Sequence, residues 1–226
     1  KRYQTWMITE QGLAPKTCNL RLTAIRSFLE YAAQEYLWLM PVYTDACTIA
    51  GVKTPNHAIE YFEPDEMTAL LAAPSGTSRT DRRNQMMLIF LYDTAARVAE
   101  ARQVKVSDLH LDAGVPYVTL LGKGRKYRNI PLMEKTVLHL KRYLKDFHGS
   151  DPKTDLPLFY AKAHGLLHEL SSDTFEKMIK RYAEQCREGG YPMPDRVHCH
   201  MIRKTRAMDL YREGVPLPHI QQLLGH

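Results

Sequence analysis

The sequence lacks several features that would place the protein in a specialised class. It has no apolar run long enough to span a bilayer, and its N-terminus does not have the form of a signal peptide. Its four cysteines include no CxxC pair, which argues against a disulfide framework and a structural zinc site. We therefore expect a cytosolic protein with reduced thiols, no membrane partner and no metal.

The same sequence also lacks internal repeats, low-complexity tracts and clusters of carboxylates of the kind that hold catalytic metals. The tract His198-Cys199-His200 has the residue types of metal ligands, but neighbours in sequence point in different directions and no second cluster completes a ligand set. The 226 residues are 44% hydrophobic and 25% charged, as in a soluble globular protein with one large or two small domains. The net charge of +6 and the pI of about 9.1 favour an anionic partner, nucleic acid first, although many basic proteins bind no DNA.

The pattern of apolar residues predicts a mainly α-helical protein with a small antiparallel β-hairpin, an α+β fold. Residues 51–56 have the composition of a linker, so we expect a helical domain at residues 1–52, a linker at 53–60 and a second domain at 61–226. In the first domain a helical stripe of apolar residues is formed by Leu20, Ile25, Phe28, Leu29 and Ala32. In the second we expect a β-hairpin at residues 115–132, a short extended segment at 158–160, and helices at 64–73, 81–93, 98–104, 134–147, 171–188, 200–212 and 218–224.

Arg97 follows a nearly all-apolar segment, residues 86–91, which predicts a buried central helix. A buried arginine is costly unless it meets a carboxylate or a phosphate, and Glu100 stands three residues further on. Two interpretations stay open from this segment alone. Either Glu100 orients Arg97 toward a phosphate, or the two residues form an internal ion pair with no catalytic task.

The turn of the expected hairpin is basic, with Lys123, Arg125, Lys126 and Arg128 and no acid. Lysine at a mobile tip can deliver a proton to a leaving oxygen, whereas a solvated basic turn can also bind phosphates without chemistry. Near the C-terminus, His200 and Arg203 are spaced to share one face of a helix. Their alternative reading is a core histidine beside a surface arginine.

Together with His226, these residues form an inventory for phosphoryl transfer without a metal: two arginines for the non-bridging oxygens, a lysine and two histidines. Their order resembles the active-site signature of the tyrosine recombinase (phage integrase) family. The resemblance lies in Thr94-Ala95-Ala96-Arg97 with Glu100, Leu121-Gly122-Lys123-Gly124 with Arg128-Asn129-Ile130-Pro131-Leu132, His200 to Thr205, and Leu223-Leu224-Gly225-His226. Residues 12–33 resemble the family's core-binding domain, including the helix entry Ala14-Pro15-Lys16-Thr17.

The resemblance implies two domains that clamp double-stranded DNA, and a tyrosine that forms a 3′-phosphotyrosyl link without any cofactor. By position, Arg97 and Arg203 would clamp the phosphate, Lys123 would be the general acid, His200 would assist proton transfer and His226 would hydrogen-bond the phosphate. Glu100 and Lys204 would support them. The implied DNA-contacting residues are Lys16, Thr17, Arg21, Arg26, Arg125, Lys126 and Arg128. The family further implies a homotetramer in a synaptic complex, a monomer without DNA, and a cytoplasmic, nucleoid-associated location in a bacterium.

The sequence departs from the family pattern at three places. Ala95 stands where glycine is usual, which a helical backbone there would tolerate, and Lys204 replaces a second histidine, which we expect to alter hydrogen bonding on the phosphate side. The family's nucleophile stands roughly nine residues beyond the last histidine, and none of the thirteen tyrosines has that position. We expect the sequence to be truncated at both ends. The alternatives are a DNA-binding regulator on a decayed recombinase scaffold and, less favoured, a helix-turn-helix repressor built on the short helices around Gly214.

Overall fold

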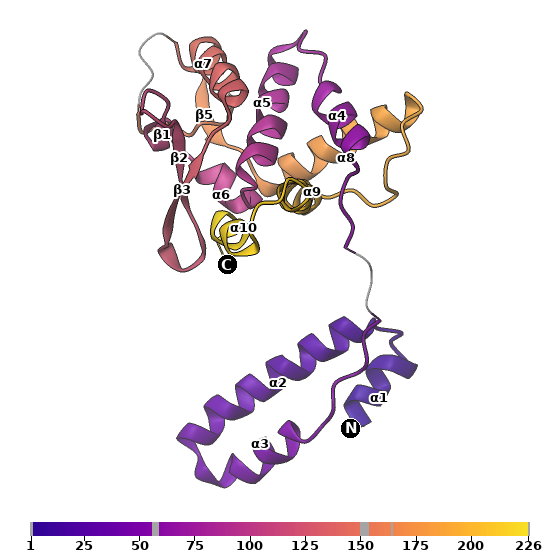
Figure 1. Cartoon of the computed structure of the whole chain (residues 1–226). Helices are drawn as coiled ribbons and strands as arrows, with labels where there is room; N and C mark the ends of the chain where they lie inside the picture. Colours follow the sequence, from indigo (N-terminus) through magenta and orange to yellow (C-terminus); the bar gives the residue numbers. More distant parts are fainter. Residues whose placement is uncertain (1, 56–58, 150–153, 164, 226) are drawn as a thin grey trace. The chain divides into compact units, whose positions relative to one another are not determined.

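The computed structural model describes residues 2–55, 59–149, 154–163 and 165–225. The chain divides into two compact units, unit 1 at residues 1–58 and unit 2 at residues 59–226 (Figure 1). Unit 1 is helical, whereas unit 2 combines helices with two small antiparallel sheets, so the predicted α+β class is confirmed. Within the described ranges, no helix is both long enough and apolar enough to cross a membrane.

Unit 1 is built on one long helix with short partners. Its elements are α1 (Arg2–Thr9), α2 (Pro15–Glu35), the 3₁₀ turn η1 (Leu37–Leu39) and α3 (Met40–Cys47). Pro15 lies in the first turn of α2, where a missing N–H costs nothing. The side chain of Asn19 closes the unit, because it donates to Val52 O (2.9 Å) and accepts from Val52 N (2.7 Å).

The helix predicted at the apolar stripe is present, but the stripe does not mark its buried face. Leu20 and Phe28 are 70% and 66% exposed, whereas Cys18, Leu22 and Ala33 are buried. The buried face is rotated away from Leu20 and Phe28, because α2 packs against α1 and α3 along the row of Cys18, Leu22 and Ala33.

Unit 2 begins with three helices, α4 (Pro64–Ala72), α5 (Arg79–Thr94) and α6 (Val98–Gln103). A three-stranded antiparallel sheet follows, in the order β1 (Leu109–His110), β2 (Tyr117–Leu121) and β3 (Tyr127–Pro131). The predicted hairpin is confirmed: β2 and β3 pair with Val118 opposite Ile130, and the turn between them contains the 3₁₀ segment η3. A second hairpin pairs β4 (Tyr160–Ala163) with β5 (Leu166–Glu169), so the extended segment expected at residues 158–160 coincides with a strand only at Tyr160. The elements of unit 2 are α4 (Pro64–Ala72), α5 (Arg79–Thr94), α6 (Val98–Gln103), η2 (Val106–Asp108), β1 (Leu109–His110), β2 (Tyr117–Leu121), η3 (Lys123–Arg125), β3 (Tyr127–Pro131), α7 (Glu134–His148), β4 (Tyr160–Ala163), β5 (Leu166–Glu169), α8 (Ser172–Glu188), α9 (Cys199–Arg212) and α10 (Leu217–Leu224).

Helix α5 is the centre of unit 2, as its apolar sequence predicts. It contacts α4, α6, α7 and α9 (Figure 1). Its side chains from Met86 to Leu88 are buried. Phe90 continues the core through an edge-on contact with Phe159, with ring centroids 5.5 Å apart. This packing holds the C-terminal end of α5 next to α6 and α9, which carry the predicted site residues.

The chain that precedes α4 is tied to α9 by one buried hydroxyl. Thr205 Oγ1 accepts a hydrogen bond from Phe62 N (2.8 Å) and donates one to Met201 O (2.9 Å). Both Thr205 and Phe62 are fully buried. The bond therefore fixes the start of unit 2 against the helix that carries His200 and Arg203.

Candidate active site

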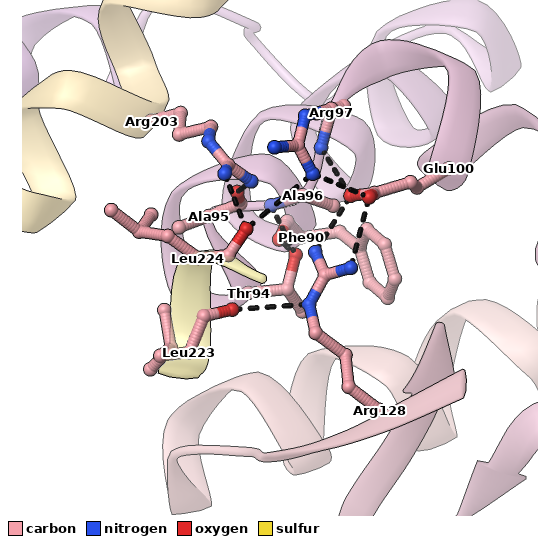
Figure 2. A network of polar contacts seen from close by, with 10 residues as sticks. All are labelled: Phe90, Thr94, Ala95, Ala96, Arg97, Glu100, Arg128, Arg203, Leu223 and Leu224. Carbon is pink, nitrogen blue, oxygen red and sulfur yellow. Dashed lines mark hydrogen bonds and ion pairs between the residues drawn. The ribbon is translucent and has the colours of Figure 1, made fainter. Parts of the chain in front are cut away.

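The predicted catalytic residues that the structure describes come from three segments of unit 2, and those of α6 and α9 meet around the C-terminal end of α5. Arg97 is the N-cap of α6, Lys123 begins η3, and His200 and Arg203 lie on α9. His226 lies outside the described residues. The preceding helix, α10, ends among the arginines of the site (Figure 2).

A left-handed residue separates α5 from α6 and sets the position of Arg97. Ala95 has φ 48° and ψ 28°, and it is fully buried. Its backbone is therefore not helical. We expected alanine to be tolerated in place of the usual glycine only if this backbone were helical, and the structure does not meet that condition. An L-residue in this conformation carries roughly 1–2 kcal/mol of strain. Thr94 braces the bend, because its hydroxyl donates to Phe90 O (2.6 Å) and accepts from Ala96 N (3.2 Å).

The carboxylate of Glu100 is the hub of the polar network drawn in Figure 2. It is 4% exposed and accepts hydrogen bonds from Arg97 N (2.7 Å) and Arg97 Nη1 (2.9 Å). Arg128 binds the same carboxylate in a bidentate manner, with Nη1 2.9 Å from Oε1 and Nη2 2.7 Å from Oε2. Burial alone would raise the pKa of Glu100, but the bonds from Arg128 and Arg97 outweigh it and lower this pKa.

The guanidinium groups of Arg97 and Arg203 converge on one oxygen atom. Arg203 donates through Nη1 to Ala95 O (2.8 Å) and through Nη2 to Leu224 O, and Arg97 Nη1 lies 3.4 Å from that same Leu224 O. Arg203 is only 3% exposed, so burial, and after it the charge of Arg97, lower its pKa to about 10. At neutral pH the guanidinium of Arg203 is therefore still charged.

His200 lies in the first turn of α9 and is exposed, with Lys204 half-buried one turn later. Although the residue is exposed as a whole, its ring is partly shielded from solvent. This shielding lowers the pKa of His200 first, and the positive charges of Arg203 and Lys204 lower it further. The imidazole is thus neutral at pH 7 and able to accept a proton. His200 is thus exposed and Arg203 is buried. The alternative interpretation expected the opposite, with His200 in the core and Arg203 on the surface.

Ion pairing decides between the two interpretations of Arg97 only in part. The Arg97–Glu100 pair exists, with Nη1 and Oε1 2.9 Å apart, but Arg97 is still 31% exposed. Its guanidinium therefore has one side on Glu100 and another that solvent or a phosphate can reach.

Among the described residues, no group of three histidine, cysteine, aspartate or glutamate side chains could hold a metal ion.

Two residues expected to contact DNA are placed differently by the structure. Arg128 is 13% exposed and donates through Nε to Leu223 O (3.1 Å) as well as to Glu100. Arg26 donates to the carbonyl oxygens that end α3 and the segment after it, with Ala46 O at 3.0 Å from Nε. In both cases the guanidinium satisfies groups of the chain itself.

A signal for the inward position of Arg128 was present in the sequence. Alternate residues of a strand share one face, so Arg128 lies on the face of the buried Ile130. The other residues expected to contact DNA are accessible to solvent. Of these, Lys16, Arg21, Arg125 and Lys126 are exposed and Thr17 is half-buried.

The fold is similar to that of solved recombinases. The integrase of transposon Tn1549 in complex with circular intermediate DNA superposes with a TM-score of 0.72 at 18% sequence identity, covering 99% of this chain and 76% of that one. The XerA recombinase superposes with a TM-score of 0.61 at 24% identity, covering 100% of this chain and 72% of the other.

Sequence comparison gives the same family. A putative integrase/recombinase, y4rC of Sinorhizobium fredii, is 31% identical over 218 residues, which are 96% of this chain and 63% of the relative. The tyrosine recombinase XerD of Halalkalibacterium halodurans is 30% identical over 223 residues, 97% of this chain and 70% of the relative. The chain thus spans about two thirds of the length of these relatives. Residues 60–226 match the model of the phage integrase family, and the chain belongs to this family of tyrosine recombinases.

Proposed function

We propose that this chain carries the DNA-binding and phosphate-activating parts of a site-specific recombinase that breaks and rejoins double-stranded DNA. The observation that supports this most directly is the convergence of Arg97 and Arg203 on one oxygen atom, Leu224 O. Two buried or half-buried guanidinium groups from separate elements, aimed at one acceptor, suit the non-bridging oxygens of a phosphodiester.

In the proposed reaction a tyrosine hydroxyl attacks the scissile phosphorus while Arg97 and Arg203 stabilise the charge that develops on the non-bridging oxygens. The tyrosine–phosphorus bond forms, the bond from phosphorus to the 5′ oxygen breaks, and Lys123 gives a proton to that oxygen. His200, neutral at pH 7, takes the proton of the nucleophile, and His226 hydrogen-bonds the phosphate. Attack by a 5′ hydroxyl of another strand on the phosphotyrosyl link reverses the step.

The proposed contacts with DNA come from both units. Lys16, Thr17 and Arg21 of unit 1 and Arg125 and Lys126 of the β2-β3 turn bind phosphates without reading sequence. Glu100 holds Arg97 in position, and Lys204 adds positive charge beside His200. We further propose that the recombinase acts in the bacterial cytoplasm at the nucleoid, as a homotetramer when two DNA sites are paired and as a monomer without DNA.

The first test is the intact mass of the product of the unmodified gene, with mapping of its C-terminal peptides. The product is then mixed with nicked duplex DNA, and complexes that survive denaturant are counted. We expect a covalent complex from the wild type and a loss of about 100-fold or more in its rate of formation for Arg203→Ala. Arg212→Ala is the matched control, since it removes the same charge from the last turn of α9, where Arg212 is 40% exposed in an ion pair with Glu63.

The outcomes separate recombination from binding. A product that contains a downstream tyrosine but forms no covalent complex with any nicked duplex it binds would refute the proposal. If Arg203→Ala loses only a modest, salt-dependent part of the DNA affinity, and the wild type forms no covalent link, the protein is a DNA-binding regulator.

A further inference from the structure

We infer that Arg128 is a positioning residue. It holds the turn that carries Lys123 and the C-terminal end of α10 in a fixed position relative to Arg97 and Arg203, which together form the proposed phosphate clamp. The inference rests on the proposed function, because it concerns the alignment of groups that act in that reaction. It assigns Arg128 to the interior of the site and not to the DNA-contacting surface.

Three nitrogen atoms of Arg128 bind two different elements. Nη1 and Nη2 bind the carboxylate of Glu100 on α6 at 2.9 and 2.7 Å, and Nε donates to Leu223 O on α10 at 3.1 Å. The side chains of Arg128 and Glu100 are 13% and 4% exposed, so water competes little for these bonds. The guanidinium of Arg128, on β3, therefore connects α6 with α10, as Figure 2 shows.

Two glycines lie directly against this guanidinium, and each precedes a residue of the proposed chemistry. A Cβ atom added to Gly122, the residue before Lys123, would lie 3.0 Å from Arg128 Nη1 and 3.4 Å from Glu100 Oε1. A Cβ atom added to Gly225, the residue before His226, would lie 3.1 Å from the same Nη1. The backbone at Gly122 and the backbone at Gly225 thus both pack against the guanidinium of Arg128.

The phosphate clamp is reached through the same contacts. Glu100 also binds Arg97, and Leu224 O, one residue after the acceptor of Arg128, accepts hydrogen bonds from both Arg97 and Arg203. A shift of Arg128 would therefore move the turn before Lys123, the end of α10 and the partner of Arg97 together. Displacements of about 1 Å in positioning groups can slow an enzymatic step by about 100-fold.

Lysine cannot replace arginine here, although it keeps the charge. Its single ammonium group cannot span both oxygens of Glu100 and also reach Leu223 O, which the planar fork of Arg128 does. For a group that only contacts a DNA phosphate, the same substitution would be mild. Arg128→Lys therefore distinguishes positioning from phosphate binding.

A second variant leaves every charge in place. Gly122 has φ −90° and ψ −174°, a conformation that alanine adopts without strain, so Gly122→Ala acts through the contacts of its added Cβ. The tightest of these is with Arg128 Nη1 at 3.0 Å, and Glu100 Oε1 and Lys126 O follow at 3.4 Å. Gly114→Ala is the matched control, because an added Cβ there meets nothing within 4 Å. Arg125→Ala, at an exposed position of the same turn, is the control for a DNA-contacting arginine.

The experiment uses the product of the complete gene and measures single-turnover cleavage and DNA affinity at several salt concentrations. We expect Arg128→Lys and Gly122→Ala to slow cleavage by about 10–100-fold with affinity within about threefold and an unchanged salt slope. Arg125→Ala should lose affinity and lower the slope by about one, and Gly114→Ala should match the wild type.

A substrate with sulfur in place of the 5′ bridging oxygen tests whether Arg128 and Gly122 act through the position of Lys123. A thiolate leaves without a proton, so misplacement of the general acid no longer matters. We expect this substrate to restore Gly122→Ala to within about threefold of the wild type, and to restore Arg128→Lys only in part because Arg97 is displaced as well.

Each outcome bears on one of the two claims. If the wild type does not cleave, the proposed function fails and not this inference alone. If the wild type cleaves and both Arg128→Lys and Gly122→Ala match it, the positioning role is refuted. A loss of affinity with a reduced salt slope in Arg128→Lys would make Arg128 a DNA contact, and a defect in Gly122→Ala that the sulfur substrate leaves unchanged would remove the link to Lys123.

Discussion

The buried carboxylate of Glu100 offers a sharp perturbation of the site, because two arginines from different elements bind it. Glu100→Gln keeps the size of the side chain and removes its charge. The guanidinium of Arg128, 13% exposed, then faces a neutral amide in place of a carboxylate. Breaking a buried ion pair by removing one partner costs about 3–5 kcal/mol, because the other charge is left uncompensated.

The chain itself supplies a way to read this effect in unit 2 alone. Both tryptophans, Trp6 and Trp38, lie in unit 1, so their fluorescence reports the unfolding of that unit and serves as an internal control. Circular dichroism in the far ultraviolet reports the helices of both units. With a urea dependence of about 2 kcal/mol/M, the loss corresponds to a midpoint lower by about 1.5–2.5 M in the transition of unit 2.

The pH dependence of the same variant follows from the lowered pKa of Glu100. The carboxylate stabilises the folded state fully above its ordinary pKa of 4.5, and this contribution is lost as pH falls through the lower pKa of the folded state. The difference in unfolding free energy between wild type and Glu100→Gln should thus be constant from pH 7 to pH 5 and should narrow in more acidic solution.

The double variant Glu100→Gln with Arg128→Met checks the cause. It removes the uncompensated guanidinium and should recover about 1–3 kcal/mol relative to Glu100→Gln alone. A midpoint shift below about 0.5 M for Glu100→Gln would refute the reasoning, since exposed pairs contribute only about 0–1 kcal/mol. An equal shift of the tryptophan transition would show that the effect is not confined to unit 2.

Three further predictions concern other groups of the chain. Arg26→Ala should lower the unfolding free energy read by tryptophan fluorescence by about 1–3 kcal/mol, because carbonyl oxygens at the end of α3 lose their charged donor. Arg21→Ala, at an exposed position, should leave this free energy within about 0.5 kcal/mol of the wild type. Thr205→Val should lower the free energy of unfolding measured by circular dichroism by about 1–3 kcal/mol, because the buried N–H of Phe62, before α4, loses its acceptor. An unchanged free energy of unfolding would contradict that role of Thr205. Burial raises the pKa of the Cys199 thiol, so a disulfide reagent at pH 8 should modify it only on unfolding, whereas the exposed Cys47 should react at once.

Most helices and the central hairpin could be predicted from the sequence. The apolar segment of α5, the proline at the start of α2 and the glycine-rich turn between β2 and β3 are local signals, readable within a few residues. The candidate site was reached in the same way, as residue types at fixed spacings. Its catalytic and DNA-binding assignments stay predictions until the variants are measured.

The sequence alone was insufficient where a conformation or a buried face depended on distant contacts. Ala95 was compatible with a helix by its side chain, but the junction of α5 with α6 requires a left-handed residue. The apolar stripe of α2 satisfied helical spacing, yet α1 and α3 pack on the row of Cys18, Leu22 and Ala33. In both cases neighbouring elements, and not the local pattern, decide which conformation or face is used.

The sequence by itself determined the inventory of the protein: helical segments, one basic hairpin, and the arginines, lysine and histidines of a phosphate site, because these follow from residue type and periodicity. Only the tertiary structure decided which cations are available. Arg125, Lys126 and Arg128 look alike in one basic turn, yet Arg128 alone of the three meets the buried Glu100 and the end of α10. A charge is held inside a protein only where its partners converge from other segments, and those partners lie 28 and 95 residues away along the chain.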